Sequence, residues 1–158
     1  MRWLAVLTLA VAAVALGGAF GSEWYGGLVP CALCLVERWP YRVAAGLGIV
    51  ALLLPRRWLL WAVVGCMVAS AVVATIHVGV EQGAWPSPLP ECAAPKFGSG
   101  SLADRLSRMP DRPSKPCDEP TFLVPGIPVS MAAMNLALAL AFGGFLAMSL
   151  TKMNRNKS

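Results

Sequence analysis

Charged side chains are scarce in this sequence: they make up 13% of its 158 residues, against about 25% in a typical soluble domain. Hydrophobic residues make up 57%, which is more apolar surface than a compact soluble domain of this size can bury. The formal net charge is +5, but the basic residues lie in turns and tails and form no basic stripe. The composition therefore predicts a membrane protein and argues against a nucleic-acid partner.

The sequence also has few of the residues that a metal or haem site needs, since it contains a single histidine. Leu35, and not a histidine, follows the Cys31-x-x-Cys34 pair, which excludes a c-type haem attachment site. Zinc favours two close cysteine pairs, but Cys92 and Cys117 are far apart in the sequence. We therefore expect no metal site.

Four apolar runs account for most of the chain, at about residues 3–20, 31–54, 58–80 and 126–150. Each reaches or approaches the ~20 residues that a helix needs to cross ~30 Å of hydrocarbon. The second run is the weakest because it contains Glu37, Arg38 and Arg42, and we expect Glu37 to neutralise one of these arginines. The pattern predicts an all-α membrane four-helix bundle that forms one domain over residues 1–158.

The distribution of charge predicts the orientation of this bundle. One side carries basic residues only, and the other side carries all eight Asp and Glu residues. The basic side contains Arg2, Arg56, Arg57, Lys152, Arg155 and Lys157. The positive-inside rule places this side, with both termini, in the cytoplasm. Cys31, Cys34, Cys92 and Cys117 then lie outside the cytoplasm, where disulfides form and persist.

The first apolar run permits another interpretation, a cleaved signal peptide, because Arg2 precedes it and the small residues Gly17, Gly18 and Ala19 end it. The run is long for such a peptide and no clean A-x-A cleavage site follows. A first membrane span is therefore favoured.

The long outer connection, about residues 81–125, is rich in proline and should be mostly extended and turned. Within it, Leu102, Leu106 and Met109 recur at helical spacing after Ser101, a residue that favours helix N-caps. We predict a short amphipathic helix on the membrane surface. A loop with scattered apolar residues is the alternative.

Cys31 and Cys34 form the more informative cysteine pair. Pro30 favours the first turn of a helix, so both thiols should lie about one turn apart near the positive end of its dipole. That position lowers thiol pKa values, and Arg38 lies four residues beyond Cys34 on the same face. We predict a redox-active pair, since a disulfide that closes so small a loop adds little stability.

Cys92 and Cys117 leave two interpretations open. Closing the loop between them stabilises a chain by about 3 kcal/mol, which is a structural role. An exposed disulfide in a proline-rich loop is equally typical of a labile, exchanging bond. Cys66, in the middle of the third run, is expected to be a small packing residue.

Three further polar residues lie in or next to the apolar runs. His77 and Glu81 are four residues apart on one helical face. Their role is either a proton relay or purely structural. Asn135 in the fourth run is expected to form an interhelical hydrogen bond.

The residues Pro30-Cys31-Ala32-Leu33-Cys34, followed by Glu37-Arg38, resemble the P-C-x-L-C-x-x-E-R signature of the disulfide bond formation protein B (DsbB) family. The stretch Trp85-Pro86-Ser87-Pro88, the later Cys117 and Phe122-Leu123 are also similar to that family. The resemblance extends over nearly the whole chain.

The resemblance implies a quinone-dependent thiol oxidase of the bacterial inner membrane, with its redox cysteines in the periplasm. A reduced dithiol protein of the DsbA type would attack Cys92 and release Cys117. Electrons would then pass to a Cys31–Cys34 disulfide and on to ubiquinone or menaquinone. Cys34 would contact the quinone, and Arg38 would polarise it.

Two alternatives to a general oxidase remain. One is a related oxidase that serves a single client protein. The other is a non-enzymatic membrane subunit whose disulfides only brace its outer loop.

Overall fold

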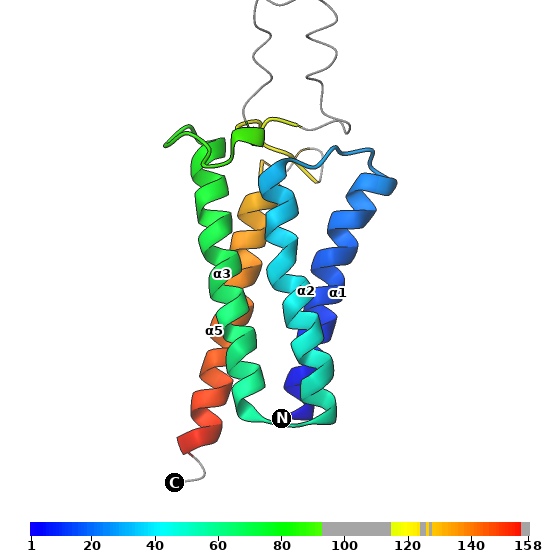
Figure 1. The fold of residues 1–158 in the computed structure, drawn as a ribbon, viewed down its shortest axis with the longest axis vertical. Helices are drawn as coiled ribbons and strands as arrows, with labels where there is room; N and C mark the ends of the chain where they lie inside the picture. The colour runs from blue at the N-terminus through cyan, green and yellow to red at the C-terminus, as the bar shows by residue number, and fades with distance from the viewer. Residues whose placement is uncertain (93–114, 124–125, 127, 156–158) are drawn as a thin grey trace, which may run out of the picture.

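The structure of the protein is a computed structural model that describes residues 1–92, 115–123, 126 and 128–155. Its long helices run alternately up and down: α1 (Arg2–Trp24), α2 (Ala32–Leu53), α3 (Arg57–Glu81) and α5 (Met131–Arg155) (Figure 1). A short 3-10 helix, η1 (Pro90–Cys92), follows α3. The described residues form no strand longer than an isolated bridge. The predicted all-α four-helix bundle is therefore confirmed. That residues 1–158 form a single domain stays a prediction.

The helices pack mainly in chain order, α1 on α2, α2 on α3 and α3 on α5. The start of α1 and the end of α5 consequently lie at one end of the bundle, and η1 and the start of α2 lie at the other (Figure 1). We call the latter the cysteine end and the former the terminal end.

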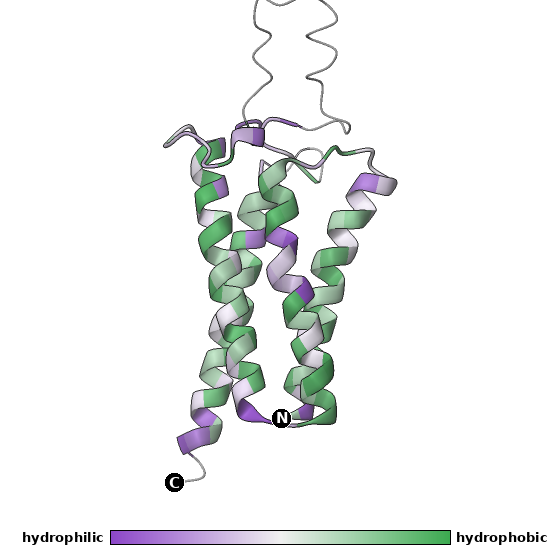
Figure 2. Cartoon of the chain, viewed as in Figure 1, coloured by the Kyte–Doolittle hydropathy of each residue, from purple (hydrophilic) through white to green (hydrophobic). Residues whose placement is uncertain are grey.

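Three helices, α1, α3 and α5, are long and apolar enough to cross a membrane, which confirms a multi-pass membrane protein. Among the four long helices described, α2 alone misses that standard, because hydrophilic residues interrupt the half nearer the cysteine end (Figure 2). They include Glu37 and Arg38, both less than 10% exposed. Charged groups are costly in hydrocarbon, so these side chains need partners within the bundle.

Three helix ends differ from the predicted spans by more than one residue, and one of them is the end of α5, which continues to Arg155, beyond the expected residue 150. Helix α1 continues to Trp24, beyond the expected residue 20. Helix α5 begins at Met131 and not at 126, because Gly126 has a positive φ of 91°, and Pro128 and Val129 are in no regular secondary structure. The Ser130 hydroxyl then accepts a hydrogen bond from the Ala133 N–H at 3.2 Å, as an N-cap does. The short helix predicted over 101–109 lies outside the described residues.

Close contact between α3 and α5 depends on a glycine. A Cβ atom at Gly143 would lie 2.9 Å from the Cβ of Met67, so a larger residue there would push the two helices apart. In lipid the hydrophobic effect does not drive helices together, so their association depends on van der Waals packing. Small residues at the contact strengthen that packing because they let the two backbones approach closely.

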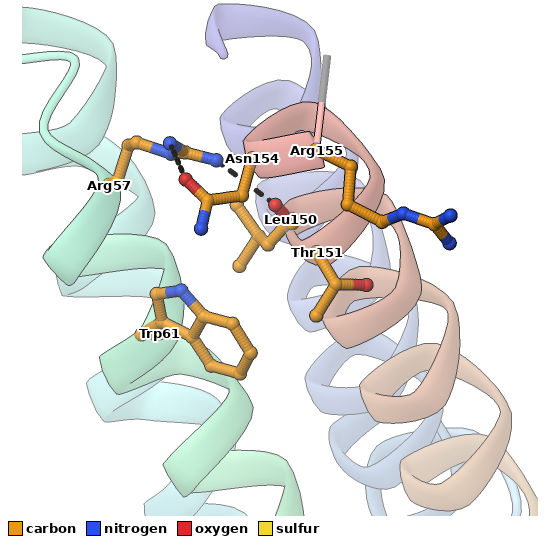
Figure 3. A pocket seen from close by; sticks show the side chains of 6 residues that line it. All are labelled: Arg57, Trp61, Leu150, Thr151, Asn154 and Arg155. Atoms are coloured by element: carbon orange, nitrogen blue, oxygen red, sulfur yellow. Dashed lines mark hydrogen bonds between the residues drawn. The ribbon is translucent and has the colours of Figure 1, made fainter. Parts of the chain in front are cut away.

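At the terminal end, Arg57 joins the same two helices. It donates hydrogen bonds to the Leu150 carbonyl and to Asn154 Oδ1, both at 3.0 Å (Figure 3). A carbonyl oxygen has two lone pairs, so that of Leu150 can accept this bond in addition to its own bond within the helix. The pocket beside these residues, which Trp61 and Arg155 also line, lies at the opposite end of the bundle from the cysteines.

Candidate redox centre

Cys31 is the N-cap residue of α2, with an extended backbone conformation. Its Sγ accepts a hydrogen bond from the Cys34 N–H at 3.1 Å. Pro30 therefore precedes the N-cap and does not lie in the first turn of the helix, as the sequence had predicted. Both sulfurs still lie at the helix N-terminus. Side-chain hydrogen bonding from Cys34 lowers the pKa of the Cys31 thiol, against the opposing effect of burial. This environment favours a thiolate at Cys31.

Cys92 and Cys117 form a disulfide, and the local backbone explains how the two meet. Cys92 ends η1, and its carbonyl accepts a hydrogen bond from the Cys117 N–H at 3.3 Å. Lys115 forms an isolated parallel bridge with Cys31. The segment that carries Cys117 therefore runs alongside the start of α2.

The four predicted redox cysteines come together in one cluster at the cysteine end. Cys31, Cys92 and Cys117 are each at most 4% exposed and pack with Leu33 and Val80, while the half-buried Cys34 packs against this group. The disulfide is therefore not exposed, as the interpretation of a labile bond assumed, and it is not an isolated staple of an outer loop. It is buried against the free thiols of Cys31 and Cys34.

A chain of polar contacts leads from this cluster into the bundle. His77 Nε2 lies 3.5 Å from the sulfur of Cys31, and His77 Nδ1 lies 2.8 Å from a Glu37 carboxylate oxygen. The other Glu37 oxygen accepts a hydrogen bond from Asn135 Nδ2 at 3.0 Å. Asn135 Oδ1 in turn accepts one from the Tyr41 hydroxyl at 2.6 Å. We call these five residues the polar chain.

The polar chain decides two of the sequence-based expectations. The interhelical role predicted for Asn135 is confirmed, since it bonds α5 to two side chains of α2. The expectation that Glu37 neutralises Arg38 or Arg42 is wrong, because His77 and Asn135 hold both of its oxygens. A buried carboxylate needs such donors, and the fold supplies them from α3 and α5.

Arg38 also has a partner that the sequence did not indicate. Its guanidinium forms an ion pair with Glu23 of α1 and lies over the Phe20 ring, 5.0 Å from the centroid. The described structure records no hydrogen bond or ion pair between Arg38 and Cys34. Arg38 Nε is buried and has no hydrogen-bond partner among the described residues.

Glu81 lies beside His77 as their spacing predicted, with Oε1 3.9 Å from His77 Nε2. The Ser130 hydroxyl donates to its other oxygen at 2.5 Å, which ties the end of α3 to the start of α5. The sequence did not single out Ser130, Tyr41 or Glu23. The only signal for the latter two was a polar group within or at the edge of an apolar run.

Cys66 lies away from this centre on α3. It carries a free thiol, is partly buried and packs against the main hydrophobic core. These contacts agree with the predicted packing role.

Free thiols at a helix N-terminus, a disulfide packed against them and a membrane-spanning bundle are the features of a membrane thiol–disulfide oxidoreductase. The chain belongs to the disulfide bond formation protein DsbB family, whose profile matches residues 1–149. It is 26% identical over 159 residues to the uncharacterized protein RP370 of Rickettsia prowazekii, covering 98% of this chain and 90% of the relative. No solved structure shows significant similarity. Membership of this family makes the protein a membrane oxidoreductase that generates disulfides.

Proposed function

We propose that the protein re-oxidises a soluble dithiol protein of the DsbA type and passes the electrons through both cysteine pairs to a membrane quinone. The observation that carries this proposal is the packing of the Cys92–Cys117 disulfide against the free thiols of Cys31 and Cys34. Thiol–disulfide exchange needs direct contact between sulfurs, and one buried cluster keeps the two pairs close enough for small movements to provide it.

The first exchange takes place at the outer pair. A thiolate of the donor attacks Cys92, forms a mixed disulfide and releases Cys117 as a thiolate. The second donor thiol resolves that bond, which leaves the donor oxidised and the outer pair reduced. The outer dithiol then reduces a Cys31–Cys34 disulfide by the same chemistry, so that two electrons reach the inner pair.

The arrangement of an oxidised outer pair and free inner thiols corresponds to the moment after this transfer. The inner dithiol gives two electrons and two protons to the quinone, which leaves as quinol, and the Cys31–Cys34 disulfide forms again. Donors of the DsbA type are strong oxidants, with potentials of about −120 mV. Their electrons therefore need an acceptor of still higher potential, and such relays to quinone are an established way to keep a periplasm oxidising.

The residues at this end of the bundle fit a quinone. Arg38 offers the buried Nε donor without a partner among the described residues, which can hydrogen-bond a carbonyl oxygen. Its permanent charge stabilises negative charge on a bound ring. Phe20, under the same guanidinium, offers an aromatic face. Cys34, the less buried inner cysteine, is our candidate for contact with the quinone.

The direction of the bundle in the membrane follows from the same proposal. The described basic residues at the terminal end favour the cytoplasm of a bacterial inner membrane. The cysteine end then faces the periplasm, where a soluble dithiol protein reaches it.

The decisive experiment is anaerobic quinone reduction by the purified full chain, driven by a reduced DsbA-type protein. We expect ubiquinone or menaquinone to be consumed in proportion to the dithiol, and Cys34→Ser to abolish this consumption. Cys66→Ser is the matched control and should retain activity. Well-folded protein that consumes neither quinone would contradict the proposal and favour a non-enzymatic subunit whose disulfide only braces the outer loop.

A further inference from the structure

Three potential metal ligands converge at the cysteine end. The Sγ atoms of Cys31 and Cys34 and a ring nitrogen of His77 all lie within 4.8 Å of one another. We propose that these side chains bind a thiophilic divalent cation such as Zn²⁺ whenever the inner pair is a dithiol. This inference goes beyond the proposed electron relay, because it assigns a second ligand to the same sulfurs.

The distance between Cys31 Sγ and His77 Nε2 fits a tetrahedral metal site. Zn–S bonds of about 2.3 Å and Zn–N bonds of about 2.0–2.1 Å, at a tetrahedral angle, place the sulfur and the nitrogen about 3.6 Å apart. Cys31 Sγ and His77 Nε2 lie 3.5 Å apart. A cation can therefore bind between them without a rearrangement of α2 against α3.

The second nitrogen of His77 is held as in natural zinc sites. A ligating histidine usually donates its other ring N–H to a carboxylate, which fixes the tautomer and directs the free lone pair at the metal. Glu37 supplies that carboxylate 2.8 Å from Nδ1, and Asn135 holds its other oxygen. With Nδ1 protonated, the Nε2 lone pair faces the sulfurs. His77 is 2% exposed, so its ring has little freedom to turn away.

The fourth position of a tetrahedral site has a candidate as well. Glu81 Oε1 lies 3.9 Å from His77 Nε2, and the Ser130 hydroxyl holds the other oxygen of the same carboxylate. The Glu81 carboxylate lies outside the three ligand atoms that are within 4.8 Å of one another, so it would have to move toward the sulfurs to complete the site, and a water molecule completes it otherwise. Two cysteines, one histidine and one oxygen donor are a ligand set that zinc accepts.

Binding of the cation and oxidation of the inner pair exclude each other. The cation takes both sulfurs as thiolates, and any thiol protons are released to solvent as it binds. Oxidation removes two electrons and joins the same sulfurs to each other, so no thiolate remains for a metal. The site is thus present only in the reduced inner pair, and a bound cation keeps that pair reduced.

The sequence argued against a metal site because it holds a single histidine and because Cys92 and Cys117 do not form a second close pair. His77 comes 46 residues after Cys31, on another helix. Only the packing of α2 against α3 brings the three ligands together.

The test uses full-length protein in detergent with Cys92→Ser and Cys117→Ser, so that the inner pair supplies the only thiolates at the cysteine end. After reduction and removal of the reductant, Co²⁺ is titrated without oxygen, quinone or dithiol protein. We expect one equivalent to bind, with a sulfur-to-cobalt charge-transfer band and the visible bands of tetrahedral cobalt, and Zn²⁺ to displace it. Prior oxidation of Cys31 and Cys34 with diamide should abolish the spectrum.

Variants assign the ligands. Cys34→Ser and His77→Ala should each weaken Co²⁺ binding by at least about 100-fold, and Glu37→Gln by about 10–100-fold, as expected for a residue that positions a ligand. Cys66→Ser is the control and should bind as tightly as the parent protein. Circular dichroism checks that each variant is folded.

If His77→Ala does not fold, X-ray absorption at the zinc edge replaces it with a measurement on the parent protein. The expected shell is two sulfurs at about 2.3 Å and an imidazole nitrogen at about 2.0 Å. No charge-transfer band, binding that survives diamide, unchanged binding in folded His77→Ala, or a zinc shell without imidazole would each overturn the proposal. None of these results depends on quinone turnover, so failure here leaves the proposed relay intact.

Discussion

The two ends of the bundle both hold polar side chains, but they use them differently. At the cysteine end His77 and Glu37 are less than 10% exposed, and their contacts join α2, α3 and α5. At the terminal end Arg57 makes one exposed and one half-buried hydrogen bond to the last turns of α5 (Figure 3). A polar contact is worth more, and costs more to break, where water cannot replace it. We therefore expect the cysteine end to carry the chemistry and much of the specificity of packing, and the terminal end to tolerate change.

The largest expected difference between the ends is in activity. Cys92→Ser should lower dithiol-driven quinone reduction by at least about 100-fold, because no outer disulfide remains for the donor to attack. Arg57→Ala at the terminal end should change the same rate less than about twofold. Stopped-flow spectroscopy of quinone absorbance measures both. Equal losses in the two variants would remove the functional distinction between the ends.

The next effect concerns the stability of the polar chain. Glu37→Ala leaves His77 and Asn135 without their shared acceptor, so we expect a loss of about 3 kcal/mol in the free energy of unfolding. Unfolding in mixed micelles with increasing dodecyl sulfate measures it. The control is Glu119→Ala, whose side chain is 66% exposed and should change stability by less than about 0.5 kcal/mol. Similar values for the two variants would show that burial does not strengthen the polar chain.

A smaller effect is expected where the polar chain ends. Tyr41→Phe removes the hydroxyl that donates to Asn135 but keeps the ring, and should cost about 1 kcal/mol. Tyr25→Phe is the matched control, since Tyr25 is 93% exposed. The same unfolding assay applies. If Tyr41→Phe leaves the free energy of unfolding unchanged, the hydrogen bond between Tyr41 and Asn135 contributes nothing to stability.

The smallest effect should come from the terminal end. Arg57→Ala removes hydrogen bonds that water can partly replace, so we expect a loss of about 0.5 kcal/mol. The exposed neighbour Arg56, changed to alanine, serves as the control in the same assay. A loss above about 2 kcal/mol for Arg57→Ala would show that polar contacts at the terminal end contribute about as much to stability as those at the cysteine end.

The contact between α2 and α3 also shows where sequence reasoning succeeded and where it failed. The spacing of Cys31 and Cys34, with Pro30 before them, was enough to predict thiols at a helix N-terminus. The spacing of His77 and Glu81 predicted a shared helical face. Neither pattern indicated that His77 would contact Cys31, because helical periodicity describes one helix at a time.

Glu37 illustrates the same limit more sharply. Its nearest opposite charges in the sequence are Arg38 and Arg42, and pairing with one of them was the simplest expectation. Neighbouring residues on a helix point in different directions, however. Glu37 therefore faces α3 and α5, and Arg38 reaches Glu23 of α1.

The sequence by itself determined the membrane class, the helices and the cysteine pattern, since hydropathy, length and spacing are local properties of the chain. The tertiary structure alone decided that the Cys92–Cys117 disulfide packs against Cys31 and that His77 lies beside the same sulfur. The physical reason is that these contacts depend on how the helices turn toward each other. That rotation is set by the combined packing of the bundle, including close approaches such as Gly143 against Met67.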